Sequence, residues 1–268
     1  MDVVKCPKHG HLRLTQPLEQ GRKMIHLVYA ELSLVTVVCV ACVIFWLGSV
    51  LPQSIEEGKR KRIVTGVLIA LCAWLFLTGT LAESGFLAAW GARPPRLPAI
   101  PMLALIAIVI VNWADVFEKL LDATPRHWPV AMQTFRVGVE LAFWGLYACG
   151  GAPEQVTFEG RNFDVLVGLT APFVAFAIAR LNLRPGVVIV WNLLGILILS
   201  NTIVTTLTSM PGPLHLNWPG MPFTAFAAWP FVWVPAFLAP LAIFIHVFSI
   251  RQNALLLLEK NPSGASQS

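Results

Sequence analysis

Charged side chains are scarce in this chain. Asp, Glu, Lys and Arg make up 12% of its 268 residues, whereas a soluble domain carries about 25%. Hydrophobic residues make up 56%, and the mean hydropathy is strongly positive. This composition excludes an ordinary soluble domain and is typical of a membrane protein.

Recognised catalytic and cofactor motifs are also missing. The sequence has no glycine-rich phosphate loop, no Ser-His-Asp arrangement and no His-Glu-x-x-His helix. The last apolar run has no lysine to attach a retinal of the microbial rhodopsin type. His26 and His246 are the only histidines for a haem between helices, and we expect them near opposite faces. The cofactor is therefore unknown.

The five cysteines give no disulfide framework, because Cys39, Cys42 and Cys72 lie inside apolar runs. The nearest approach to a metal site is in the N-terminal segment, where three soft or borderline ligands fall within six residues. They are Cys6, His9 and His11. A cluster at a chain terminus is more often incidental, so these three are weak candidates and no metal is predicted.

Seven apolar runs are each long enough to cross a bilayer, which takes about 20 residues. They cover residues 25–50, 63–83, 98–117, 129–149, 163–182, 186–209 and 229–250. Their apolar character is continuous rather than alternating, which favours helices over a β-barrel. We therefore expect an all-α fold, a polytopic transmembrane bundle of about seven helices.

A single membrane domain is expected to occupy most of the chain. Residues 24–252 form the seven-helix transmembrane domain, residues 1–23 a polar N-terminal extension, and residues 253–268 a polar, disordered tail. The first apolar run exceeds the core of a secretory signal, which is about 7–15 residues. It is therefore expected to be retained as the first span.

The positions of Lys and Arg predict the orientation of the chain. The net charge of +5 does not indicate nucleic acid, because in a membrane chain the distribution of cations between loops matters more than their sum. A basic cluster, Lys59–Arg62, separates the first two runs, and residues 210–224 are uncharged. Cytoplasmic loops carry the excess of Lys and Arg. We predict a multi-pass protein with its N-terminus outside and its C-terminus in the cytoplasm.

The fourth run carries polar side chains along one face. Gln133, Arg136, Glu140, Trp144 and Tyr147 follow one another at steps of three or four residues, which places them on one side of a helix. Ionisable groups at membrane depth are costly and usually face the bundle interior. Two interpretations remain open: a structural ion pair between Arg136 and Glu140, or the lining of an internal polar cavity.

Other runs add single candidates. Asp115 is expected either at the water interface or in a cavity, and Asn192 belongs to a face of small and hydroxylated residues that favours helix packing over ligand contact. His246 is either a packed residue or a proton carrier. In the same last run, Pro235 and Pro240 should bend the helix.

The segment 150–163 is the most polar connection between runs. Glu159 and Arg161 are placed to pair, and Asn162 or Asp164 can cap the following helix. The alternative is an outward-facing lid or ligand clamp.

The string from Thr157 to Asp164 resembles the TFEGRNFD-type signature of a widespread family of uncharacterised bacterial multi-pass membrane proteins. It continues with Leu166, Gly168, Leu169, Thr170, Ala171 and Pro172. The same pattern includes Ser84-Gly85-Phe86, Pro94-Pro95-Arg96, Arg136 with Glu140 and Trp144, Trp191-Asn192, and Trp233-Val234-Pro235 with His246. The resemblance does not reach residues 1–23. It implies a seven-helix protein of the bacterial inner membrane, and it implies no chemistry.

Three functions remain open. The first is a binding, sensory or accessory protein with an outward-facing polar pocket for a small amphipathic or anionic ligand, formed by Arg136, Glu140, Asn192 and the loop from Glu159 to Asp164. The second is a small-molecule or proton-linked transporter. The third is an enzyme that acts on a lipid or isoprenoid with Glu140, Asp115 or His246 as acid or base. The sequence leans away from an enzyme, predicts a lipid bilayer as partner, and leaves the oligomeric state unknown.

Overall fold

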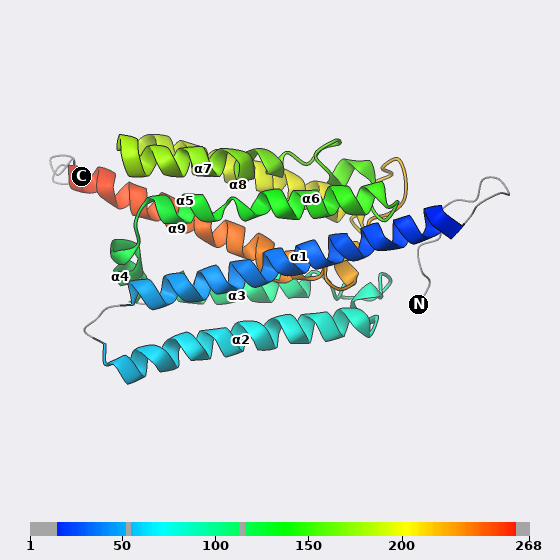
Figure 1. Cartoon of the computed structure of the whole chain (residues 1–268), viewed down its shortest axis with the longest axis horizontal. Coiled ribbons are helices and arrows are strands. Elements are labelled where there is room, and N and C mark those ends of the chain that lie inside the picture. Colours follow the sequence, from blue (N-terminus) through cyan, green and yellow to red (C-terminus); the bar gives the residue numbers. More distant parts are fainter. Residues whose placement is uncertain (1–14, 52–54, 113–115, 261–268) are drawn as a thin grey trace.

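The computed structural model describes residues 15–51, 55–112 and 116–260, which form helices and no strand. The long helices run side by side along the longest axis of the molecule (Figure 1). They are α1 (Thr15–Val50), α2 (Glu57–Glu83), α7 (Asp164–Leu181), α8 (Pro185–Ser209) and α9 (Ala239–Lys260). The all-α class predicted from the sequence is confirmed.

Five segments are long and apolar enough to cross a membrane. They are Gly21–Val50, Glu57–Glu83, Asp164–Leu181, Pro185–Ser209 and Val234–Glu259. The helices α3 (Ala99–Asn112) and α4 (Val116–Ala123) make a sixth if they are taken together, although they are bent by 81°. The expected number of seven is therefore approximate, and the helices fit a lipid bilayer environment.

The expected fourth span is divided into α5 (His127–Met132) and α6 (Phe135–Ala148). At the break, the N–H groups of Gln133, Arg136 and Val137 donate to carbonyls three residues earlier instead of four. This tightening is of the 3₁₀ kind, which in the middle of a helix often accompanies a functional site. It places Arg136 in the first turn of α6.

The last span begins with a π-helical turn, η4 (Val234–Leu238). Pro240 has no N–H, so the carbonyl of Ala236, four residues earlier, lacks its helical donor. The indole Nε1 of Trp74 in α2 donates to that carbonyl at 3.0 Å, and the indole of Trp233 donates to the carbonyl of Leu75 at 3.0 Å. Pro235 and Pro240 were expected to bend the helix; the structure has a π-helical turn there, within a segment that forms one span. The carbonyl freed by Pro240 finds its donor on α2, as membrane helices require.

We expect Trp74→Phe to lower the free energy of unfolding by about 1–3 kcal/mol, because it leaves the Ala236 carbonyl without its donor. Thermal unfolding in detergent, followed by helical circular dichroism, measures this effect. Trp128→Phe is the matched control, since it keeps an aromatic ring against Phe45. Equal unfolding temperatures for the two variants would mean that the carbonyl does not depend on the indole.

The helices extend past both ends of the predicted transmembrane domain, and at the C-terminal end this corrects the expected disorder. Residues 15–23, expected in a polar extension, are the first turns of α1, and residues 253–260, expected in a disordered tail, are the last turns of α9. The reason at the C-terminal end is a fully buried Asn253, whose side chain is bonded to Arg126.

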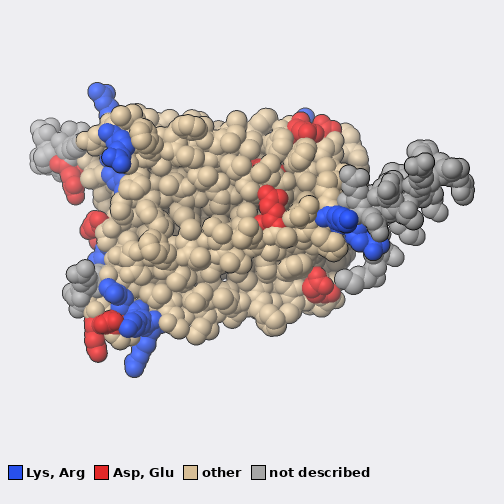
Figure 2. All heavy atoms as spheres, in the orientation of Figure 1, with Lys and Arg blue, Asp and Glu red and all other residues tan. Residues whose placement is uncertain are grey.

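The main apolar core lies between α1, α6 and the η4–α9 segment, with Leu32, Ala142 and Leu238 almost completely buried. Most of the charged side chains visible in Figure 2 gather at the two ends of the molecule, and the band between them is mainly uncharged. Such a band is the part of the surface that suits the hydrocarbon core of a bilayer.

Candidate functional site

A buried ion pair joins α6 to α7. Nε of Arg136 donates to Oδ2 of Asp164 at 2.7 Å, and Nη2 donates to Oδ1 of the same carboxylate. Arg136 is 1% exposed and Asp164 is 6% exposed. The two-point contact fixes the plane of the guanidinium. Of the two interpretations left open for these residues, an ion pair between Arg136 and Glu140 is therefore wrong: Asp164, from the neighbouring helix, offers both of its oxygens to the guanidinium.

Glu140 is instead held by an amide. Nδ2 of Asn162 donates to both carboxylate oxygens of Glu140, at 2.8 and 2.7 Å, while Oδ1 of Asn162 accepts from the Thr202 hydroxyl at 2.6 Å. Asn162 also accepts from the N–H of Asp164 at 3.1 Å, which supports the start of α7. Within the described parts of the chain, no Lys, Arg or His nitrogen lies within 4.0 Å of the Glu140 carboxylate.

His246, fully buried in α9, connects the ion pair to α8. Its Nε2 lies 2.9 Å from Nη1 of Arg136, and its Nδ1 lies 2.8 Å from Oδ1 of Asn192. A guanidinium can only donate, so Nε2 must accept and Nδ1 must carry the proton that is donated to Asn192. This arrangement requires a neutral imidazole.

The hydrogen bonds continue toward the opposite end of the bundle. Nδ2 of Asn192 donates to the hydroxyl of Ser249 at 3.0 Å, and Nδ2 of Asn253 donates to the carbonyl of Ser249 at 2.8 Å. Arg126, which precedes α5, donates to Oδ1 of Asn253 at 2.7 Å. A string of polar side chains thus connects Arg136 to Arg126 through α8 and α9.

A cavity of about 300 Å³ adjoins the ion pair. Arg136, Glu140 and Asp164 contribute to its wall, and the rest is mainly apolar and comes from α3, α6, α8, η4 and α9. Met102 of α3 and Ile203 of α8 belong to the wall and are 60% and 40% exposed on the surface. The cavity therefore adjoins the surface that would face lipid between α3 and α8.

The polar loop before α7 is fastened to its neighbours. Nε1 of Trp144 donates to Oε1 of Glu159 at 2.7 Å, and the guanidinium of Arg161 lies 4.9 Å from the ring centre of Trp218. Gly160 permits this path, because a Cβ there would lie 2.7 Å from the Cα of Gln155. As far as the structure describes the cavity wall, Glu159 and Arg161 do not contribute to it.

The predicted site residues therefore separate into three groups. Arg136, Glu140 and Asp164 line the cavity, Asn162 and Asn192 stand behind them as hydrogen-bond partners, and Glu159 and Arg161 lie apart. Asp115 and the weak metal candidates lie outside the described residues; the latter are Cys6, His9 and His11. Among the residues that are described, no group of three or more His, Cys, Asp or Glu side chains could hold a metal ion.

Sequence reasoning missed the far half of the polar string. In the sequence, Arg126 lies between two apolar runs, where a cation is ordinary. Nothing in the sequence shows that Ser249 and Asn253 belong to a polar string that includes α8. The spacing of His246, Ser249 and Asn253 by three and four residues was the available signal, because it puts all three on one face of a helix.

The fold and the cavity define a class: an all-helical protein whose long apolar helices fit a membrane and enclose a partly charged cavity. No family model, curated protein or solved structure matches the chain. The resemblance to the bacterial family stays a prediction.

Proposed function

We propose that this protein is an integral membrane protein that binds a small amphipathic molecule in the cavity beside Glu140. One observation carries the proposal: a buried carboxylate, that of Glu140, makes no ion pair within the described residues and borders a cavity with mainly apolar walls. Ionisable groups at membrane depth are expensive and usually functional. A ligand with an apolar body and one polar group would match both parts of the wall.

The charges of the wall favour a ligand that donates to Glu140. The cavity is bordered by the carboxylates of Glu140 and Asp164 but by only one guanidinium, that of Arg136. That guanidinium already donates to Asp164 and His246. An anionic head group would meet two carboxylates and an occupied cation, whereas an amine or a hydroxyl would find an acceptor. We therefore favour a cationic or hydroxylated amphiphile over an anionic one.

Three eight-carbon probes test this choice in detergent-solubilised protein. We expect octylamine to bind more tightly than 1-octanol, and octanoate to bind most weakly, as measured by isothermal titration calorimetry. Glu140→Gln keeps the shape of the side chain and removes its charge. It should weaken octylamine binding by roughly 10–100-fold, the equivalent of a charge-assisted hydrogen bond of about 1.5–3 kcal/mol.

Glu159→Gln is the matched control for the charge of Glu140. Glu159 is an exposed carboxylate held by Trp144 outside the cavity wall, so its neutralisation should leave the binding of all three probes unchanged. Tightest binding of octanoate, or equal loss of octylamine binding in the two variants, would contradict the proposed site.

The proposed orientation places the N-terminus outside and the C-terminus in the cytoplasm. The end of the bundle where α2 begins carries Lys59–Arg62. It also receives Arg180, in the last turn of α7, and Arg184, directly before α8. An excess of cations is typical of the cytoplasmic side. The assignment to a bacterial inner membrane depends on the family resemblance alone.

Cysteine labelling in intact cells tests the orientation. A cysteine at Lys61, in a variant without the natural cysteines, should react with a membrane-impermeant maleimide only after the membrane is permeabilised. A cysteine at Arg161 should react before permeabilisation. The reverse pattern would invert the whole topology, because the two positions lie at opposite ends of the bundle (Figure 1).

The two alternatives have less support in this geometry. A transporter needs a path between both ends, and the way from Arg136 to Arg126 is occupied by hydrogen-bonded side chains. An acid–base enzyme needs a carboxylate beside a partner base. In the described part of the chain, no carboxylate oxygen lies within 4.0 Å of a histidine nitrogen.

A further inference from the structure

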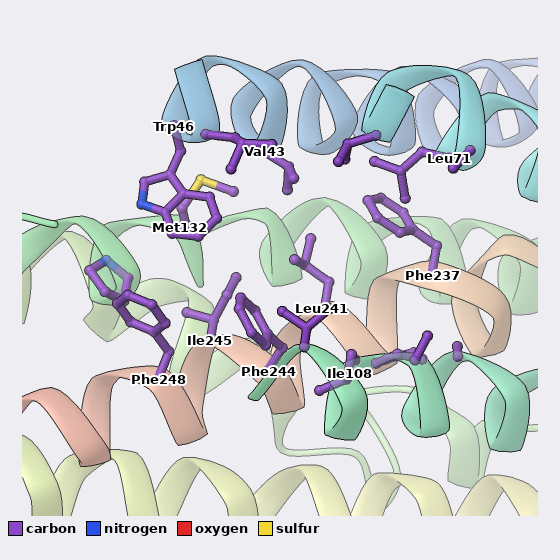
Figure 3. Close-up of a pocket in the computed structure, with 18 of the residues that line it drawn as sticks. Val43, Trp46, Leu71, Ile108, Met132, Phe237, Leu241, Phe244, Ile245 and Phe248 are labelled. Carbon is purple, nitrogen blue, oxygen red and sulfur yellow. The ribbon is translucent and has the colours of Figure 1, made fainter. Parts of the chain in front are cut away.

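A second cavity, of about 570 Å³, lies between α2 and the rest of the bundle. Figure 3 shows Val43 and Trp46 of α1 on one side, with Phe237, Leu241 and Phe244 of the η4–α9 segment on the other, and these side chains point into the space between them. Residues of α2, α3, α4 and α5 contribute the rest of the wall. Of the residues that border the Glu140 cavity, only Pro240 borders this one as well, so the two are separate sites.

The wall of this second cavity offers almost no polar contact. The indole of Trp46 donates to the Thr124 hydroxyl at 3.0 Å, and that hydroxyl donates to the carbonyl of Leu120 at 2.6 Å. The indole of Trp74 is bonded to the carbonyl of Ala236. A buried water needs two to four polar partners, and these groups already have theirs. The cavity therefore suits hydrocarbon.

The hydrocarbon can enter from the side, because α2 and α3 are loosely packed. In α2 only Thr78, Gly79 and Ala82 are buried, all near its end. In α3 only Ile100 is buried. Ala70 of α2 and Leu103 of α3 both belong to the cavity wall and are exposed on the surface that would face lipid. A lipid chain in the bilayer therefore lies next to the opening.

Charge at one end of the cavity indicates which lipid would fit. The wall includes Val67 of α2, and the basic cluster Lys59–Arg62 begins the same helix. Val67 is the fifth residue after Arg62 on this helix, a rise of about 7.5 Å. A chain inserted beside Val67 therefore places its head group level with these cations, and basic residues at a membrane surface attract anionic lipids.

We infer that the second cavity holds one acyl chain of an anionic phospholipid, whose head group lies against Lys59–Arg62. The apolar wall accounts for the chain, and the cations account for the head group. This site is independent of the proposed ligand at Glu140 and concerns the bilayer lipid itself.

Native mass spectrometry of delipidated protein tests the chain site. When dioleoyl phosphatidylglycerol is added to the delipidated wild type, we expect one molecule to stay bound in the mass spectrometer. Dioleoyl phosphatidylcholine, added in the same way, should dissociate. Ala70→Trp should fill the cavity and lower phosphatidylglycerol retention at least 10-fold. Ala73→Trp, on the same helix but outside the cavity wall, is the matched control and should retain the lipid.

The head-group contact is tested by Lys59→Gln combined with Arg62→Gln, two exposed positions whose replacement does not touch the core. Each basic residue near the surface contributes about 1 kcal/mol to anionic lipid binding, so retention of phosphatidylglycerol should fall roughly 10-fold or more. This variant decides the matter even if Ala70→Trp does not fold. Equal retention of the two lipids by the wild type would overturn the inference. A dimer that only Ala70→Trp dissociates would also do so, because a second copy would then be the occupant.

Discussion

Arg136→Gln is expected to lower the free energy of unfolding by about 3–5 kcal/mol, the largest effect of any single substitution in this bundle. Removing one member of a buried ion pair leaves the other charge without compensation. Here it leaves two carboxylates, Asp164 and Glu140, in the same apolar surroundings, and it removes the donor to Nε2 of His246. Chemical unfolding in detergent, followed by helical circular dichroism, measures the loss.

A double-mutant cycle separates the charge from the shape. If the cost arises from an uncompensated carboxylate, Asp164→Asn in the Arg136→Gln background should restore on the order of 1–3 kcal/mol. Arg161→Gln is the control, since Arg161 is an exposed arginine outside the cavity wall. Strictly additive losses in the double variant would show that the two side chains do not depend on each other.

Gly195→Ala should be the second severe substitution, with a loss of about 1–3 kcal/mol from overpacking. A Cβ at Gly195 would lie 2.7 Å from Nε2 of His246, closer than side chains pack. The imidazole cannot move aside, because its two nitrogens are bonded to Arg136 and Asn192. The measurement is again the free energy of unfolding in detergent.

Gly186→Ala, in the first turn of the same helix, is the matched control. A Cβ there meets no atom within 4 Å, so the higher helix propensity of alanine should leave stability unchanged or raise it by up to about 1 kcal/mol. If the two alanine variants had the same stability, the tight contact between α8 and His246 would not hold this part of the bundle.

The long spans could be predicted from the sequence because hydrocarbon imposes one requirement, a continuous apolar run of sufficient length. The division of the fourth run could not, since α5 and α6 separate through backbone hydrogen bonds to Gln133 and Thr134 that no apolar pattern records. The last helix begins later in the chain than the expected apolar run, for a related reason. There, a carbonyl of the η4 turn accepts from the indole of Trp74 in α2.

The burial of the charged residues in the candidate site was predictable, but their hydrogen-bond partners were not. Burial of Arg136 and Glu140 follows from the cost of charge in a membrane, and the sequence analysis selected both. Their partners come from a loop and from other helices: Asp164 for the arginine and Asn162 for the glutamate. A spacing of four residues shows that Arg136 and Glu140 share a face of one helix. It does not show that the carboxylate of Asp164, on another helix, takes the place of Glu140 as the partner of the arginine.

The tautomer of His246 bears on whether the string of polar side chains from Arg136 to Arg126 can carry protons. A proton relay requires every member to release a proton on one side and regain one on the other. Arg136 is never deprotonated in proteins, and the amide of Asn192 accepts at Oδ1 and donates from Nδ2 without passing a proton from one atom to the other. Although the string reaches from the cavity beside Glu140 to Arg126, it does not conduct protons, so the buried charges beside that cavity cannot exchange protons with the Arg126 end of the bundle by this route.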